Sequence, residues 1–175
     1  MFFLKKKENL TGYIEKVINE YSDLLFRQAF YRLGKTSEAE EIVQDVFVAF
    51  YKVSEKGTEI SNIKAYLLQS THNACNNLIS RRRMEIVPLT DDYILYEEVE
   101  PITKYEKTEI IYKLLKQLPE EQAEVIYLKL TEGLKFHEIA EVLQITESTV
   151  KSRFRYGVEK LKSIIQTKNY YNELF

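Results

Sequence analysis

Cationic and hydroxyl side chains are concentrated in one short stretch near the C-terminal end of the chain. Residues 147–162 carry five basic and two acidic side chains, although the formal net charge of the whole chain is only −2. Arginine can pair bidentately with guanine in the major groove of DNA, and serine or threonine can bond bases or phosphates. The residues of this stretch that we expect to face outward are Ser148, Thr149, Lys151, Ser152, Arg153, Arg155 and Tyr156. We therefore predict that this stretch binds DNA.

The hydrophobic spacing around this stretch is typical of a helix-turn-helix. A short helix is predicted over residues 136–143, a three-residue turn follows, and a longer helix begins at Glu147. Thr146 is suited to cap the longer helix. Gln144 stands where glycine is common, and a left-handed backbone there would cost about 1 kcal/mol. An ordinary helical hairpin with a solvated cationic face is the alternative.

A second group of polar side chains lies on a predicted helix that Ser61 caps and that ends at Arg83. Amides can read base edges, aromatic rings can stack on unpaired bases, and arginines can hold phosphates. The members of this group are Lys64, Tyr66, His72, Asn73, Asn76, Asn77 and Arg81–Arg83, which we expect near one surface. Nucleic-acid binding is one interpretation. The other is a polar face whose basic end complements the helix dipole.

A third candidate surface lies on the helix whose apolar stripe runs from Ala39 to Val53, with Ser37 and Glu40 as its predicted capping box. An acidic face with an exposed apolar residue could dock a basic protein surface, and simple solvation is the alternative. The polar face consists of Glu40, Glu41, Gln44, Asp45, Val48 and Lys52.

Residues that could carry catalysis or hold a metal are few. The chain has one cysteine and two histidines, too few for a probable structural zinc site, and it has no glycine-rich phosphate loop. Cys75 lies on an apolar stripe, where we expect it in the core. We therefore expect no catalytic residue, metal, cofactor or small-molecule substrate, and no enzymatic activity.

The elements that must position these surfaces are predicted to be helices throughout, which makes the fold class all-α. The chain is 45% hydrophobic and contains only 5 glycines and 3 prolines, whereas sandwiches and barrels need many turns. Apolar residues keep helical spacing over residues 13–33 and again in the C-terminal half. No apolar run approaches the roughly 18 residues of a membrane span. Together with the lone cysteine, this predicts a cytoplasmic protein that does not insert into membranes.

An acidic segment divides the chain into two helical halves. Residues 86–107 carry two basic and six acidic side chains, whereas residues 1–85 carry 13 and 11, and residues 108–175 carry ten of each. Periodicity is weak over residues 86–103, which we interpret as a flexible linker that could extend over about 60 Å. The predicted domains are residues 1–85 and 104–175.

Two segments resemble bacterial RNA polymerase sigma factors of the sigma-70 family. SEAEEIVQDVFVAFYK resembles their core-binding segment. Their promoter-reading module resembles a second segment, LLKQLPEEQAEVIYLKLTEGLKFHEIAEVLQITESTVKSRFRYGVEKL. The TVKSR motif also occurs in response regulators, so its combination with EEIVQDVF makes the match specific. The resemblance covers about residues 10–165, and the short length is similar to the extracytoplasmic-function (ECF) branch.

The resemblance implies a role for each surface. Such a protein binds core RNA polymerase and directs promoter-specific transcription initiation by reading −35 and −10 elements. The last helix would read the −35 element through its outward-facing residues. The −10 element would be recognised and opened by Ile63, Lys64, Tyr66, Asn73, Asn77, Arg81 and Arg82. The clamp helices of the largest polymerase subunit would be bound by Glu40, Glu41, Gln44, Asp45 and Val48.

The resemblance further implies an anti-sigma factor as a partner that would bury the polymerase-binding and DNA-binding faces. The acidic linker would thread through the polymerase interior. Two rival functions stay open, namely a stand-alone helix-turn-helix transcriptional regulator and a helical adaptor that binds no DNA.

Three positions depart from the pattern of the family. Family members often have an aromatic residue near the position of Ile63, and Tyr66 could compensate for the missing ring. They often have an aspartate near the position of Asn77. Gly157 replaces a common alanine in the recognition helix and should cost about 1 kcal/mol of helix stability.

Overall fold

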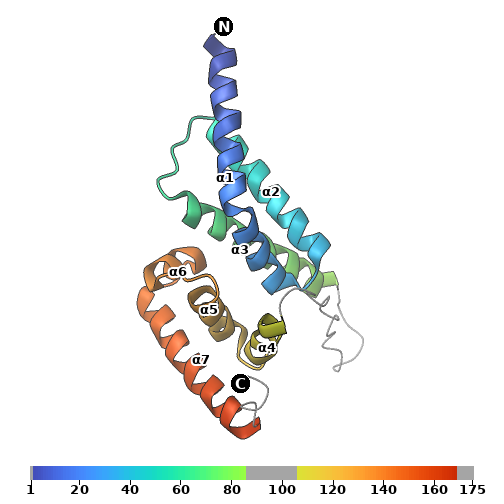
Figure 1. The fold of residues 1–175 in the computed structure, drawn as a ribbon, viewed down its shortest axis with the longest axis vertical. Helices are drawn as coiled ribbons and strands as arrows, with labels where there is room; N and C mark the ends of the chain where they lie inside the picture. The colour runs from blue at the N-terminus through green and yellow to red at the C-terminus, as the bar shows by residue number, and fades with distance from the viewer. Residues whose placement is uncertain (1, 86–105, 169–175) are drawn as a thin grey trace. The chain divides into compact units, whose positions relative to one another are not determined.

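The computed structural model describes residues 2–85 and 106–168, and within these ranges every regular element is an α-helix (Figure 1). The all-α prediction is therefore confirmed. The chain divides into two compact units, residues 1–100 and 101–175. The linker predicted over residues 86–103 lies outside the described residues, so the domain boundaries stay a prediction. Among the described helices, none combines the length and apolar character that crossing a membrane requires.

The described part of the N-terminal unit, residues 2–85, contains three long helices, α1 (Phe2–Leu33), α2 (Thr36–Glu55) and α3 (Ile63–Glu85), which all pack against one another (Figure 1). α1 begins well before the predicted residue 13. The helices meet along the apolar stripes read from the sequence. Their fully buried side chains include Leu25, Phe50, Leu67, Leu68 and Cys75, so the cysteine belongs to the core as predicted.

Two of the predicted helix caps in this unit are wrong. Gly34, with φ of 72°, ends α1, and only Gly34 and Lys35 separate α1 from α2. Ser37 therefore already lies inside the first turn of α2, whose N-cap is Lys35, and no side-chain cap forms. At the start of α3 the cap is Asn62, whose Oδ1 accepts a hydrogen bond from the Ala65 N–H at 3.1 Å. Asparagine caps helices as well as serine, so Ser61 is not needed.

The C-terminal unit is built around α5. Its helices are α4 (Glu106–Leu115), α5 (Glu120–Leu130), α6 (Phe136–Leu143) and α7 (Glu147–Lys168). Every residue from Ala123 to Leu128 of α5 is buried, because α4, α6 and α7 all contact this helix. α5 thus serves as the support against which α6 and α7 are held.

Candidate nucleic-acid interface

The predicted helix-turn-helix is formed by α6, a turn over residues 144–146, and α7. Ile139 and Val150 are fully buried and hold the two helices together. Gln144 ends α6 in the left-handed conformation, with φ of 55° and ψ of 40°. The following Ile145 N–H donates to the Ala140 carbonyl at 3.1 Å. The sharp turn therefore forms with glutamine where glycine would be unstrained.

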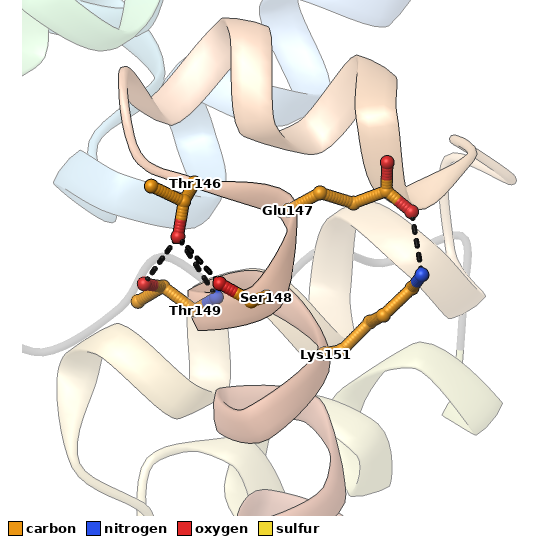
Figure 2. A network of polar contacts seen from close by, with 5 residues as sticks. All are labelled: Thr146, Glu147, Ser148, Thr149 and Lys151. Atoms are coloured by element: carbon orange, nitrogen blue, oxygen red, sulfur yellow. Dashed lines mark hydrogen bonds and ion pairs between the residues drawn. The ribbon is translucent and has the colours of Figure 1, made fainter.

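Hydroxyl groups define the first turn of α7 (Figure 2). Thr146 Oγ1 accepts a hydrogen bond from the Thr149 N–H at 3.2 Å, which confirms the predicted N-cap. The same oxygen lies 2.9 Å from Ser148 Oγ and 2.8 Å from Thr149 Oγ1. The network fixes these side chains at the N-terminal end of the helix, where the helix dipole favours anions.

Lys151 is exposed one turn further along α7, where it forms an ion pair with Glu147 at 2.7 Å (Figure 2). The hydrogen bond from Lys151, together with its positive charge, lowers the pKa of the Glu147 carboxyl. Exposed pairs of this kind contribute little to stability. Lys151 can therefore exchange the carboxylate for a phosphate at small cost.

Further along α7, Arg155 and Tyr156 are both exposed, and the Arg155 guanidinium carbon lies 4.8 Å from the centre of the Tyr156 ring. Stacking on the ring restricts the arginine while leaving its N–H edges accessible. Ser152 is half-buried, and its hydroxyl donates to the Thr149 carbonyl at 2.9 Å. Of these three residues, Arg155 and Tyr156 form the accessible surface.

Arg153 differs from the outward orientation that we expect from the sequence. Its Nη2 forms an ion pair with Glu121 Oε2 of α5 at 2.6 Å, and only 25% of its side chain is exposed. Periodicity indicates only the approximate face of a residue on its own helix, so this partner on another helix was not predicted.

On α3, the residues predicted to contact DNA divide into two groups. Asn73, Asn77 and Arg81 are exposed, whereas Ile63, Lys64, Tyr66 and Arg82 are half-buried. The Tyr66 ring packs 6.0 Å from that of the fully buried Phe50. Arg82 forms an ion pair with Glu38 of α2. The exposed residues are thus directly accessible, while Arg82 also ties the end of α3 to α2.

The expectation that all polar residues of α3 share one surface is wrong. Arg32 of α1 donates from Nη2 to Asn76 Oδ1 at 2.5 Å. Asn76 Nδ2 in turn lies 2.9 Å from His72 Nε2. His72 and Asn76 therefore form a part-buried contact between α1 and α3. The i,i+4 spacing of His72 and Asn76 is a signal for their mutual contact, but the sequence gives no signal for Arg32.

The acidic face of α2 is accessible as predicted. Glu40, Glu41, Gln44 and Asp45 are exposed, and the apolar Val48 beside them is 46% exposed. The opposite face of α2 is buried and includes Phe47, which is 8% exposed. α2 thus presents carboxylates around an uncovered valine.

No cluster of three or more potential metal ligands among histidine, cysteine, aspartate and glutamate occurs within residues 2–85 and 106–168. The three surfaces on α2, α3 and α7 are the candidates for function.

Comparison with known families gives two matches. Residues 17–85 match sigma-70 region 2, and residues 108–161 match sigma-70 region 4, so the two together cover more than half of the chain. The ECF RNA polymerase sigma factor SigW of Bacillus subtilis is 24% identical over 159 residues, which cover 83% of this chain and 85% of SigW. The ECF RNA polymerase sigma factor SigL of Mycobacterium tuberculosis is 28% identical over 152 residues, with 85% and 86% covered.

Solved structures show the same fold. The sigma factor RpoE of Bartonella quintana, solved in complex with the anti-sigma factor NepR, superposes with a TM-score of 0.66 at 20% identity, covering 88% of this chain and 97% of RpoE. CnrH, solved with the cytosolic domain of CnrY, gives a TM-score of 0.65 at 18% identity, covering 89% of this chain and 88% of CnrH.

Proposed function

This chain belongs to the sigma-70 family of RNA polymerase sigma factors, in its ECF branch, and from that premise we propose how its surfaces carry out transcription initiation. It is an initiation factor that binds core RNA polymerase and directs it to promoters. The proposal depends on one observation: regions 2 and 4 occur together in one chain, which favours a sigma factor over a stand-alone regulator. We assign it no enzymatic activity of its own and a cytoplasmic location, where polymerase and promoters are found.

The −35 element is read by α7 in the major groove. The hydroxyls of Ser148 and Thr149, held by Thr146, face the phosphates or base edges near the helix N-terminus. Lys151 supplies a phosphate contact by releasing Glu147. Arg155 and Tyr156, which are exposed, extend the contact surface along the groove. Ser152 and Arg153 are half-buried, as Thr149 is, and contact DNA through the exposed parts of their side chains.

The −10 element is recognised by α3 and the residues at its start. Asn73, Asn77 and Arg81 are exposed and can contact bases and phosphates directly. The half-buried Ile63, Lys64 and Tyr66 lie in the first turn of α3, next to the loop that precedes it. A role for Arg82 in DNA binding requires it to share or leave its ion pair with Glu38.

Core RNA polymerase is bound by the acidic face of α2. Glu40, Glu41, Gln44 and Asp45 suit a basic protein surface, and burial of the exposed Val48 side chain adds a hydrophobic contribution of about 1–2 kcal/mol. The clamp helices of the largest polymerase subunit are the proposed contact.

A further partner is an anti-sigma factor. The solved relative RpoE is bound to the anti-sigma factor NepR. By analogy, an anti-sigma factor would cover the polymerase-binding and DNA-binding faces of this chain and thereby prevent initiation.

Charge reversal on α2 tests the polymerase assignment. The double variant Glu41→Lys, Asp45→Lys should lose binding to purified core polymerase while keeping the far-UV circular dichroism of the wild type, because both side chains are exposed. The double variant Glu15→Lys, Asp23→Lys is the matched control, since it makes the same charge change at exposed positions of α1. Unchanged polymerase binding by the α2 variant would remove the assignment of this face.

A further inference from the structure

The ion pair between Arg153 and Glu121 links the candidate DNA-reading helix to the helix that supports it. Arg153 Nη2 lies 2.6 Å from Glu121 Oε2, and the Glu121 side chain is 69% exposed. A pair with one partner this exposed contributes roughly 0–1 kcal/mol to stability. The ion pair itself therefore contributes little to stability, while the Glu121 carboxylate also lies in the first turn of α5, where the helix dipole favours a negative charge.

Close packing of α5 and α7 brings the two charges together. Gly157 follows Arg153 by four positions on α7, so both lie on the same helix face. A Cβ at Gly157 would lie 2.6 Å from Ile126 Cδ1 and 3.2 Å from Gln122 Cβ. Gln122 is the residue next to Glu121, so the close approach that Gly157 permits also brings Glu121 within reach of Arg153. The pair is thus a consequence of buried packing.

Holding an arginine in place has a consequence for binding. The guanidinium carries five N–H donors in a planar fork, and its long side chain has about 2 kcal/mol of rotamer entropy. A carboxylate that accepts from one nitrogen restricts the fork before DNA arrives, so less freedom is lost on binding. Thr149 lies one turn before Arg153 on the same helix, and its position is fixed by Thr146.

We propose that Glu121 is a positioning residue for promoter recognition, whose carboxylate orients the Arg153 guanidinium so that its remaining N–H groups meet the −35 DNA in one geometry. The inference rests on the proposed function of α7. Glu121 acts through Arg153, because a carboxylate gains nothing from DNA phosphates. If the ion pair were instead a latch that must open before DNA binds, removal of the Glu121 carboxylate would strengthen DNA binding.

The test uses holoenzyme assembled from full-length chain and core polymerase. The probe is a promoter duplex that wild-type holoenzyme enriches from a library with a randomised −35 segment, compared with the same duplex carrying a scrambled −35 segment. The measured quantity is the discrimination ratio, which is the dissociation constant for the scrambled duplex divided by that for the enriched duplex, at one fixed salt concentration. The variants are Glu121→Gln, Arg153→Ala and their combination. Glu159→Gln is the control, since it removes one exposed carboxylate from α7 itself.

Glu121→Gln should lower the discrimination ratio about five-fold, and Arg153→Ala should lower it about ten-fold or more. The combined variant should match Arg153→Ala, and Glu159→Gln should leave the ratio unchanged. Because Gln is nearly isosteric with Glu, the melting temperatures should agree, which excludes unfolding as the cause.

Four results would overturn the inference. Tighter binding of the enriched duplex by Glu121→Gln would identify a latch. A lower discrimination ratio in the combined variant than in Arg153→Ala would show that Glu121 does not act through Arg153. An unchanged ratio for Glu121→Gln beside a lowered one for Arg153→Ala would remove the positioning role alone. If Arg153→Ala itself leaves the ratio unchanged, the proposed contact of Arg153 with the −35 DNA fails as well.

Discussion

Replacing Gly157 with alanine tests whether α5 and α7 pack as closely as described. In an ordinary helix interior the change would stabilise by about 1 kcal/mol. Here the new Cβ would lie 2.6 Å from Ile126 Cδ1 and 3.2 Å from Gln122 Cβ. Ile126 is 2% exposed and has little room to move, and overpacking a core costs about 1–3 kcal/mol. We therefore expect Gly157→Ala to lower the free energy of unfolding of the C-terminal unit by about 1 kcal/mol.

Two further variants isolate the contact. Gly12 lies inside α1, and a Cβ there would meet nothing within 4 Å, so Gly12→Ala should stabilise by about 0.5–1 kcal/mol. Ile126→Val removes the Cδ1 atom that lies closest to position 157, at a cost of about 1 kcal/mol by itself. Combined with Gly157→Ala, it should cost less than the sum of the two single changes, because the clash disappears.

The assay is hydrogen exchange on the full-length chain, which reports the stability of α5 and α7 separately from that of α1 to α3. Lower protection of α5 and α7 in Gly157→Ala, with unchanged protection of the N-terminal helices, is the expected result. If Gly157→Ala stabilises as much as Gly12→Ala, the two helices lie further apart than the structure indicates, and the packing argument for the Arg153–Glu121 pair loses its basis.

Gln144→Gly should raise the free energy of unfolding by about 1 kcal/mol in urea titration, since residue 144 has a positive φ of 55°; a loss of stability would show that the glutamine side chain compensates for the strain. The pKa of Glu147, lowered by Lys151, should return towards 4.5 in Lys151→Gln when followed by carboxyl NMR. Since the folded-state pKa lies below the unfolded one, the pair stabilises the protein above pH 4.5 and is lost as pH falls through the folded-state value; an identical Glu147 titration in both proteins would show that the pair is absent in solution. Both amide atoms of the buried Gln28 lack a hydrogen-bond partner among the described residues, so Gln28→Met should raise the thermal midpoint, by the equivalent of about 1 kcal/mol. A lowered midpoint would indicate that the amide is satisfied by buried water.

The sequence predicts those features that depend on neighbours a few positions away. Apolar spacing located the buried faces of the helices, and the polar face of α2 around Val48 is exposed as expected. Thr146 caps α7 because its hydroxyl needs to reach only the Thr149 N–H. Gln144 takes up the left-handed turn because both flanking helices are specified by their own periodicity. Even so, the capping box at Ser37 failed, since the shortness of the turn at Gly34 shifts the start of α2.

Partners on other helices were decided by the tertiary structure alone. The links from Arg153 to Glu121 and from Arg32 to Asn76 join residues far apart in the chain. From the sequence, Gly157 is expected only to lower the stability of its helix, yet it lies where α5 approaches α7 closely. Periodicity fixes which side of a helix faces the core, because burial depends on the average character of that face. Which side chain meets which depends on the distance and rotation between two packed helices, and these follow from the whole core.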